Sequence, residues 1–174
     1  IRTSMKYFIP EGQPAVIAIT STISGEGKTF VAMNIAAIIS MLGKKTLLVG
    51  LDLRKPRINK ILNLDHSKGM STYLSGNSKF DDVIQPTPIE NLWFVSSGPI
   101  PPNPSELIER SAMNEFLVMA RKQFDYIIID TPPAAVVTDA LLLAARADLT
   151  LFVVRQRYSA RSTLSLIDEI YRNK

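Results

Sequence analysis

A glycine-rich turn between an apolar run and a helical pattern limits what this chain can fold into more than any other feature. The run Val16-Ile17-Ala18-Ile19 predicts a buried strand, and residues 24–29 read Ser-Gly-Glu-Gly-Lys-Thr. Glycines let the backbone fold so tightly that successive N–H groups point at phosphate oxygens, and the next helix directs its positive dipole end there. The sequence therefore predicts a phosphate-binding loop, in which Lys28 reaches the β- and γ-phosphates and the Thr29 hydroxyl ligates Mg²⁺.

Composition narrows the class of protein. The chain has 174 residues, 46% hydrophobic and 21% charged, which is typical of one soluble globular domain with a substantial core. The net charge of +4 suits anionic ligands, but no basic run with interleaved aromatic residues predicts nucleic-acid binding. Cysteine is absent, which excludes disulfides and thiolate metal sites within this chain and fits a reducing compartment. Neither a long apolar span nor the layout of a signal peptide is present in the sequence.

Short apolar runs alternate with helical patterns, which is typical of a parallel sheet built from β-α units. Several runs are apolar almost throughout, as strands covered on both faces should be. We therefore predict an α/β fold of the three-layer P-loop NTPase type, with a mostly parallel central sheet and helices on both faces. The predicted strands are Ala15 to Thr20, Thr46 to Leu51, Leu92 to Ser96, Tyr126 to Asp130 and Leu149 to Val154.

Periodicity and capping residues predict two helices. The first runs from about Lys28 to Leu42 and ends at Gly43, a plausible C-terminal cap. The second opens with Asn103 as its cap, Pro104 at the first helical position and Glu106 reaching back as in a capping box. Residues 98–104 contain four prolines and predict a stiff, extended loop. The apolar face of the first helix is assigned to Val31, Ile35, Ile38, Ile39 and Leu42.

Two acids follow predicted strands, at the edge where a parallel sheet binds its ligands. Asp52 and Arg54 end the second strand, so both side chains would face a nucleotide crevice. The run 126–130 is an apolar strand that ends in Asp130, the layout of a Walker B acid that holds Mg²⁺ directly or through water. The sequence thus predicts that Thr29, Asp52 and Asp130 meet at a metal ion beside the phosphate loop.

Three segments resemble the bacterial protein-tyrosine kinases of capsule and exopolysaccharide export, which reuse a P-loop ATPase fold. They are the loop 21–29, the strand end Asp52-Leu53-Arg54-Lys55-Pro56 and the turn Asp130-Thr131-Pro132-Pro133. Residues 69–76, which read Gly-Met-Ser-Thr-Tyr-Leu-Ser-Gly, and residues 101–107, which read Pro-Pro-Asn-Pro-Ser-Glu-Leu, also match stretches typical of that family. The resemblance covers nearly the whole chain, and the second stretch has no generic ATPase role.

The resemblance implies an ATP- and Mg²⁺-dependent protein-tyrosine (auto)kinase that regulates polysaccharide synthesis and export. The γ-phosphoryl group would pass to a tyrosine in the tail of a neighbouring subunit. Lys28, Asp52, Arg54 and Asp130 would be catalytic, because phosphoryl transfer needs positioning and charge neutralisation. A carboxylate base would also help a tyrosine hydroxyl, whose pKa is near 10. The implied nucleotide contacts are Ser24, Gly25, Glu26, Gly27, Lys28, Thr29, Phe30 and Arg155, of which Arg155 either flanks the adenine or is a surface arginine.

The same resemblance implies the setting of the chain. It would be the cytoplasmic domain of an inner-membrane-associated bacterial protein, with a ring-like homo-oligomer, a transmembrane activator or upstream membrane segment, tyrosine-containing substrates and no nucleic acid. Residues 1–174 are expected to be one ATP-binding domain, cut at both ends. Arg2 matches the end of the family's self-association helix, and Tyr171 has the spacing of a packing residue rather than of a phosphoacceptor. The remaining self-association helix and the tyrosine-rich tail are expected to lie outside this sequence.

One departure from the family's pattern lies on the second strand. Members usually carry Asp-x-Asp-x-Arg there, and this chain has Gly50 at the place of the first acid. Either Asp52 serves as both base and metal ligand, or catalysis is slow, or Gly50 simply lets the backbone approach a neighbour closely.

Two rival functions remain open on the sequence. Regulatory ATPases that place division sites or partition plasmids share the fold but usually carry a signature lysine in the loop, where this chain has Ile23. A non-catalytic nucleotide switch that controls assembly would account for Gly50.

Two further positions can each be interpreted in two ways. Arg54 is either part of a solvated basic face or a contact to phosphate or to an acid of the next subunit, and Thr138-Asp139 is either a helix cap or a supporting contact.

Overall fold

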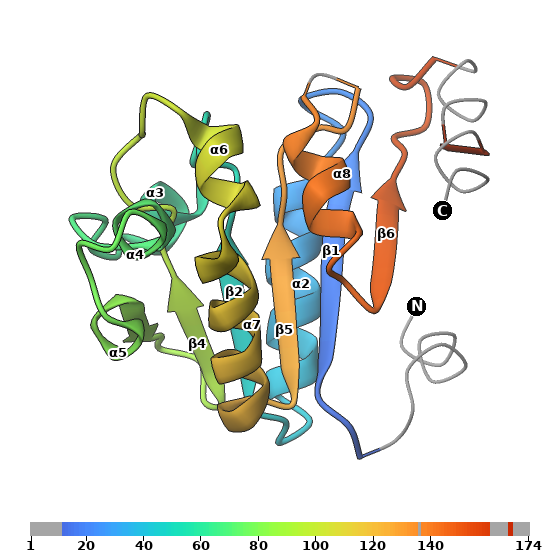
Figure 1. Ribbon diagram of the computed structural model, residues 1–174. Coiled ribbons are helices and arrows are strands. Elements are labelled where there is room, and N and C mark those ends of the chain that lie inside the picture. The colour runs from blue at the N-terminus through green and yellow to red at the C-terminus, as the bar shows by residue number, and fades with distance from the viewer. Residues whose placement is uncertain (1–11, 136, 161–166, 169–174) are drawn as a thin grey trace.

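A six-stranded sheet is the centre of the fold in the computed structural model, which describes residues 12–135, 137–160 and 167–168. The strand order is β3-β4-β2-β5-β1-β6; β3 pairs antiparallel with β4 at one edge, and the other pairs are parallel. The predicted α/β class with a mostly parallel sheet is confirmed (Figure 1). The strands are β1 (Ala15–Ser21), β2 (Thr46–Gly50), β3 (Ile84–Pro86), β4 (Leu92–Val95), β5 (Tyr126–Asp130) and β6 (Leu149–Val153).

The five strands predicted from apolar runs are all present, with bounds that differ by at most one residue. The sixth strand, β3, was not predicted. It has three residues and ends at Pro86, so it is too short to show alternation and carries a residue that is confined to sheet edges.

Helices cover both faces of the sheet, as predicted. The structure places α2 (Lys28–Ser40) behind the sheet in Figure 1, and α6 (Pro104–Glu109), α7 (Ser111–Gln123) and α8 (Asp139–Ala144) in front of it. Beside β4 lie α3 (Ile58–Leu62), α4 (Met70–Leu74) and α5 (Phe80–Val83). The carboxyl ends of the parallel strands therefore all meet at the upper edge, where the loops that follow them converge.

Two apolar cores separate the layers. Val49, Ile127 and Ile129 face α7 and the short helices α4 and α5, whereas Leu48 and Ile128 face α2. Neighbouring residues of β5 thus enter opposite cores, and all three isoleucines are fully buried. This double coverage explains why the strand is apolar throughout instead of alternating.

Helix α2 differs from its prediction in length and in which residues it buries. It ends at Ser40 rather than Leu42, and Gly43, with a φ of 78°, donates its N–H to the Ser40 carbonyl. Ile38 is 51% exposed and Leu42 48%, so neither belongs to the buried face. Small residues pack against the sheet in their place, because close approach of helix and strands favours alanine; the buried apolar set is Ala32, Ile35, Ala36 and Ile39.

Helix α6 begins at Pro104, as predicted, but its cap differs. Asn103 makes no side-chain hydrogen bond to the helix backbone; its amide Nδ2 instead donates to Glu106 Oε2 at 2.6 Å. The predicted capping box is therefore wrong, since the two side chains bond to each other. The proline-rich segment before the helix is an irregular loop, in agreement with the prediction.

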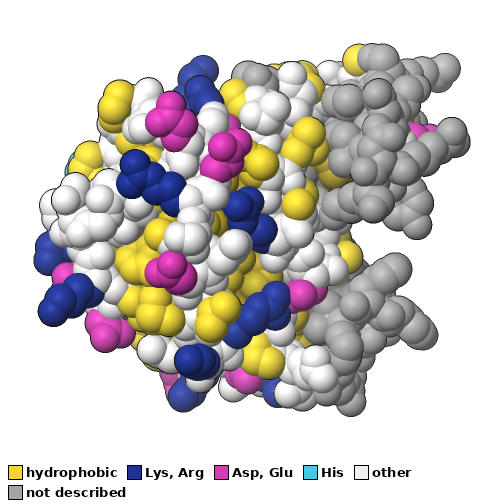
Figure 2. Space-filling view, viewed as in Figure 1, with side chains coloured by type: hydrophobic (Ala, Val, Ile, Leu, Met, Phe, Trp, Pro, Cys, Tyr) yellow, Lys and Arg dark blue, Asp and Glu magenta, His cyan; other side chains and the backbone are white. Residues whose placement is uncertain are grey.

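The surface that carries α6 and α7 is mixed in character. Lys and Arg, Asp and Glu and hydrophobic groups are interspersed over it (Figure 2). Among the described residues, the helices are all too short or too polar to cross a bilayer. The predictions that concern Arg2 and Tyr171 fall outside the described residues.

Candidate functional site

The glycine-rich loop sits between the end of β1 and the start of α2, at the upper edge of the sheet. Gly25 and Gly27 have φ values of 94° and 100°, in the left-handed region that favours glycine. A Cβ atom on Gly25 would lie 2.6 Å from the Tyr158 hydroxyl oxygen, so a side chain there would also displace the end of Tyr158. Both glycines are therefore needed for the loop to take this shape.

The N–H groups of residues 24–30 are free to bind a ligand. None of them donates a hydrogen bond to any residue that the structure describes, whereas Val31 N–H already donates to the Gly27 carbonyl at 3.0 Å. A run of unpaired donors at a helix N-terminus is a site for an anion with several oxygens, as a phosphate chain has.

The loop is held from its other side by the segment that follows β6. Tyr158 donates its hydroxyl to the Ser24 carbonyl at 3.0 Å, and Arg155 Nη1 donates to the Gly25 carbonyl at 3.1 Å. Arg155 also lies over the Tyr158 ring, 5.2 Å from its centroid. These contacts use the loop's carbonyls and leave its N–H groups unpaired. The structure thus places Arg155 against the loop backbone; sequence reasoning missed Tyr158 as its partner.

Glu26 is a buried part of the same support. Its Oε2 accepts the N–H of Ile23 at 2.8 Å, and its Oε1 accepts the hydroxyl of Ser159. The carboxylate therefore lies 4% exposed inside the loop rather than at the ligand side. The prediction that Glu26 belongs to the nucleotide-binding loop thus rests on its backbone N–H, which donates to no described residue.

A buried cluster of one cation and two anions lies beneath the loop. Lys28 Nζ is 3.2 Å from Asp52 Oδ2 and 3.3 Å from Asp130 Oδ1. Thr29 donates its hydroxyl to Asp130 Oδ2 at 2.8 Å, and Asp52 Oδ1 accepts the N–H of Lys55 at 3.0 Å. The structure thus brings Lys28, Thr29, Asp52 and Asp130 together, from the loop and from the ends of β2 and β5. The cluster carries one more negative than positive charge.

Asp130 is the more deeply buried of the two acids, with 2% of its surface exposed against 8% for Asp52. Burial raises the pKa of the Asp130 carboxyl above its ordinary value, although Lys28 and Thr29 both donate to it. Two carboxylates and a hydroxyl are hard oxygen ligands that suit Mg²⁺, which also keeps water molecules and takes oxygens from substrate phosphates. The described residues hold no group of three or more acids or histidines that would complete a metal site alone. The residues present fit a magnesium ion that shares its shell with phosphate.

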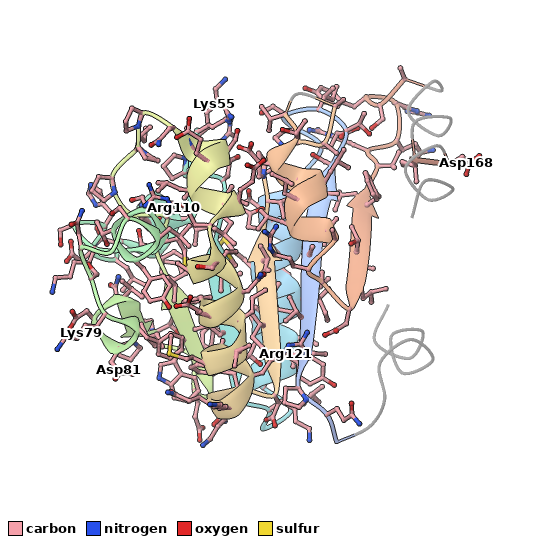
Figure 3. All side chains as sticks on the ribbon, in the orientation of Figure 1. Lys55, Lys79, Asp81, Arg110, Arg121 and Asp168 are labelled. Carbon is pink, nitrogen blue, oxygen red and sulfur yellow. The ribbon has the colours of Figure 1, made fainter. Side chains whose placement is uncertain are left out.

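A pocket of about 540 Å³ opens over this cluster. The loop, Lys28 and Asp52 form its base, and an apolar wall comes from Phe30, Met33 and Ile61. Phe30 is 72% exposed, so this wall is open to solvent. Three cationic side chains also line the rim: Arg54, Lys55 and Arg57. Lys55 stands at the upper edge of the molecule, above the ends of the strands (Figure 3).

Arg54 is held at this rim by an acid from a distant part of the chain. Its Nε donates to Asp139 Oδ2 at 2.9 Å, and its Nη2 donates to Ser105 Oγ at 2.9 Å. Burial opposes the charge of Asp139, but hydrogen bonds from Arg54 and Ser105 hold its pKa below the ordinary value. The same hydrogen bond raises the pKa of Arg54. Thr138 makes no side-chain cap on α8, so of the two readings of Thr138-Asp139 the supporting contact is the observed one.

Gly50 is packed against the loop after β4. A Cβ on Gly50 would lie 2.9 Å from Ser97 Oγ and 3.4 Å from Ser97 N. Only the distance to Oγ is shorter than ordinary contact, and that atom ends a side chain, so the reading that Gly50 permits a close backbone approach stays a prediction.

The same loop explains part of the 69–76 stretch. Met70 and Ser71 donate their N–H groups to the Ser96 and Ser97 carbonyls at 2.8 and 3.0 Å. A Cβ on Gly69 would lie 2.3 Å from the Ser96 carbonyl oxygen, so two backbones cross here with no room for a side chain. This crossing fixes the position of α4 on the loop that leads toward α6.

Comparisons with known proteins agree with this geometry. A family profile described as an AAA domain matches residues 14–173. The putative tyrosine-protein kinase in the cps region of Klebsiella pneumoniae is 36% identical over 155 residues, 89% of this chain and 22% of that protein. Tyrosine-protein kinase YwqD of Bacillus subtilis is 36% identical over 154 residues, 88% of this chain and 65% of that protein.

A solved structure gives the same assignment. The kinase domain of Escherichia coli tyrosine kinase ETK has a TM-score of 0.93 at 31% identity, over 98% of this chain and 68% of that one. This chain spans about a fifth of the length of the Klebsiella relative and about two thirds of the Bacillus one. The chain belongs to the AAA domain family and, within it, to the bacterial tyrosine-kinase domains that resemble it from the phosphate loop to the last strand.

Proposed function

We propose that this chain binds ATP with Mg²⁺ at the glycine-rich loop and transfers the γ-phosphoryl group to protein tyrosines, as part of the control of capsule or exopolysaccharide synthesis. The observation that carries the proposal is the run of unpaired N–H groups at residues 24–30 beside the Lys28 cluster. The names of the relatives, which are tyrosine-protein kinases, support the type of reaction.

Each residue of the cluster has a role in this proposal. Lys28 leaves its two carboxylates to bind β- and γ-phosphate oxygens, and Thr29 and Asp130 provide oxygens for Mg²⁺. When bound, Mg²⁺ neutralises charge on the phosphate oxygens. Asp52 accepts the proton of the tyrosine hydroxyl or holds the metal. Arg54 contributes positive charge at the rim of the pocket.

The walls of the pocket suit a tyrosine side chain. Phe30, Met33 and Ile61 offer apolar contact to a phenol ring, and their exposure leaves the path to the cluster open. Aromatic rings pack favourably against such surfaces while the hydroxyl stays polar. The acceptor tyrosine therefore packs against these apolar residues of α2 and α3.

The setting is also part of the proposal. We infer a cytoplasmic domain that works in a ring-like homo-oligomer, is activated by a transmembrane partner or an upstream membrane segment, and phosphorylates tyrosines of neighbouring subunits. The name of the Klebsiella relative places that protein in a cps region, which supports the link to capsule.

The test distinguishes a tyrosine kinase from a regulatory ATPase and from a non-catalytic nucleotide switch. The chain is incubated with labelled ATP, Mg²⁺ and a tyrosine-rich peptide, and phosphotyrosine is measured against released phosphate. Phosphotyrosine that disappears in Lys28→Met supports the proposal. The matched control is Lys79→Met at the N-cap of α5, an exposed lysine at the lower left in Figure 3, away from the upper edge of the sheet, which should keep full transfer.

Two other outcomes would overturn the kinase assignment. Phosphate release without phosphotyrosine would indicate a regulatory ATPase. ATP binding with neither product would indicate a nucleotide switch, for which Gly50 would then be the reason.

A further inference from the structure

Asp139 is a buried carboxylate that belongs to none of the nucleotide-binding motifs. It is the first residue of α8 and is only 1% exposed. An ionised carboxylate in such a position must be compensated by donors, or it would be costly to bury. Its donors are Arg54, through Nε at 2.9 Å and Nη2 at 3.4 Å, and the Ser105 hydroxyl at 2.6 Å.

The three side chains form a closed triangle. Ser105 donates its hydroxyl to Asp139 Oδ1 and accepts from Arg54 Nη2, so each member bonds to the other two. They come from the loop after β2, from the first turn of α6 and from the first turn of α8. The triangle therefore fixes the position of the arginine head group against two helices that themselves lie in contact.

One end of the guanidinium stays free. Arg54 Nη1 donates to no residue that the structure describes, while Nε and Nη2 are both used by the triangle. The side chain is 39% exposed and lines the same pocket as Lys28. The guanidinium is thus anchored through two of its three nitrogens, in a side chain that lines the pocket.

We propose that Asp139 and Ser105 are positioning residues, which hold Arg54 so that its free Nη1 donates to a phosphate oxygen of the bound nucleotide. This inference rests on the proposed nucleotide site. A long arginine side chain normally loses conformational freedom when it binds a ligand; here that freedom is already lost on folding. The triangle gives the Pro-Asn-Pro-Ser-Glu-Leu stretch a role, because Ser105 is its serine.

The alternative is that the triangle only ties α6 to α8. The two readings differ in how the substitutions combine. If Asp139 acts through Arg54, its removal has no further effect once Arg54 is gone; if it acts only through the fold, the two losses add.

The test is a double-mutant cycle on the affinity for Mg²⁺·ATP and for Mg²⁺·ADP, measured by calorimetry. Arg54→Gln and Asp139→Asn should each weaken ATP binding about tenfold, as expected for one lost charge-assisted hydrogen bond, and the double variant should be no weaker than Arg54→Gln. The inference would be overturned if Asp139→Asn weakened ATP binding equally in the wild type and in the Arg54→Gln variant, or did not weaken it at all.

Ser105 offers a milder pair for the case in which Asp139→Asn does not fold. Ser105→Ala should weaken ATP binding about threefold, and Ser105→Thr, which keeps the hydroxyl, should restore it. Failure of Ser105→Ala to weaken binding, or of Ser105→Thr to restore it, would contradict the inference.

ATP affinity is measured independently of phosphoryl transfer to tyrosine. A non-additive cycle without any phosphotyrosine would thus support the triangle and refute the kinase assignment, whereas phosphotyrosine with an additive cycle would do the reverse.

Discussion

Two clusters of opposite charges lie at the same edge of the sheet, and they differ in balance. The Lys28 cluster has one cation and two carboxylates, all buried, with Lys28 Nζ shared between Asp52 and Asp130 at 3.2 and 3.3 Å. The Arg54 triangle has one cation, one carboxylate and one hydroxyl, and every pair is bonded. The first is short of positive charge; the second is neutral.

This difference indicates which cluster changes when a ligand binds. Burial raises the pKa of Asp130, which means that its ionised form is poorly satisfied by the protein alone. The pKa of Asp139 is lowered, which means that the protein satisfies its charge. We therefore expect the Lys28 cluster to open for Mg²⁺ and phosphates and the Arg54 triangle to stay closed.

The largest expected effect comes from Asp130→Asn. Asp130 contacts both Lys28 and Thr29, so the substitution removes charge from the residues that would hold metal and phosphates. Phosphotyrosine formation should fall about 10³-fold, the size typical of losing a central electrostatic group. The measurement is the rate of peptide phosphorylation at saturating ATP. A fall of less than tenfold would remove Asp130 from the site.

Asp52→Asn should have the next largest effect. Asp52 is the carboxylate that remains to act as base or metal ligand at the end of β2, where Gly50 has none. Transfer should fall about 10²-fold, as for loss of general base or metal positioning. Asp81→Asn is the control, since Asp81 is an exposed acid on α5 (Figure 3). Unchanged transfer in Asp52→Asn would end this assignment.

The same substitution should have different effects on stability in the two clusters. Asp139→Asn is expected to lower the free energy of unfolding at pH 7 by about 1–2 kcal/mol, because hydrogen bonds to a charged group are lost and half-exposed Arg54 is partly screened. Asp130→Asn should leave that free energy unchanged or raise it by up to about 1 kcal/mol, because a poorly satisfied buried charge is removed. Urea unfolding at pH 7 measures both. Equal losses of unfolding free energy in the two variants would contradict the difference between the clusters.

The pH dependence of stability follows from the direction of each pKa shift. A lowered pKa means that Asp139 contributes stability above its ordinary value of 3.8, and this contribution is lost as the pH falls through the lower folded value. A raised pKa means that ionised Asp130 opposes folding at neutral pH, and acidification through its folded pKa relieves that cost. The stability gap between wild type and Asp139→Asn should therefore close in acid. A gap of constant size from pH 7 into acid would contradict the ion pair.

The smallest expected effect comes from Gly50→Ala at the end of β2. Gly50→Ala brings a Cβ to 2.9 Å from Ser97 Oγ, and this crowding should cost about 1 kcal/mol. Ser97→Ala in the same chain should recover most of the loss, because it removes the nearest atom. Denaturant midpoints of the single and double variants test this. A Gly50→Ala variant as stable as wild type would show that crowding does not explain why this position lacks an acid.

The sequence predicted those parts whose signals are local. The loop 24–29 and the strand ends at Asp52 and Asp130 follow from apolar runs, glycines and the geometry of parallel sheets, and the structure brings these residues together. The partners of Arg54 could not be predicted this way, because Ser105 and Asp139 lie 51 and 85 residues away in sequence. Only the packing of α6 against α8 brings them to one place.

Two other misses have different physical causes. Ile38 and Leu42 have helical spacing, but the sheet packs on the alanine side of α2, so periodicity alone selected residues that are half exposed. The support of the loop by Arg155, Tyr158 and Ser159 depends on how the chain turns after β6, and no motif marks it. The contact of the Glu26 carboxylate with Ser159 could not be predicted for the same reason, because the two residues lie 133 positions apart.

The most direct test of the comparison is a crystal structure with Mg²⁺ and a non-hydrolysable ATP analogue. We predict that Lys28 Nζ moves from Asp52 and Asp130 to phosphate oxygens, that the N–H groups of residues 24–30 bind the phosphates, and that Arg54 remains on Asp139. Lys28 still held between both carboxylates, with the phosphates bound elsewhere, would contradict the assignment of this site.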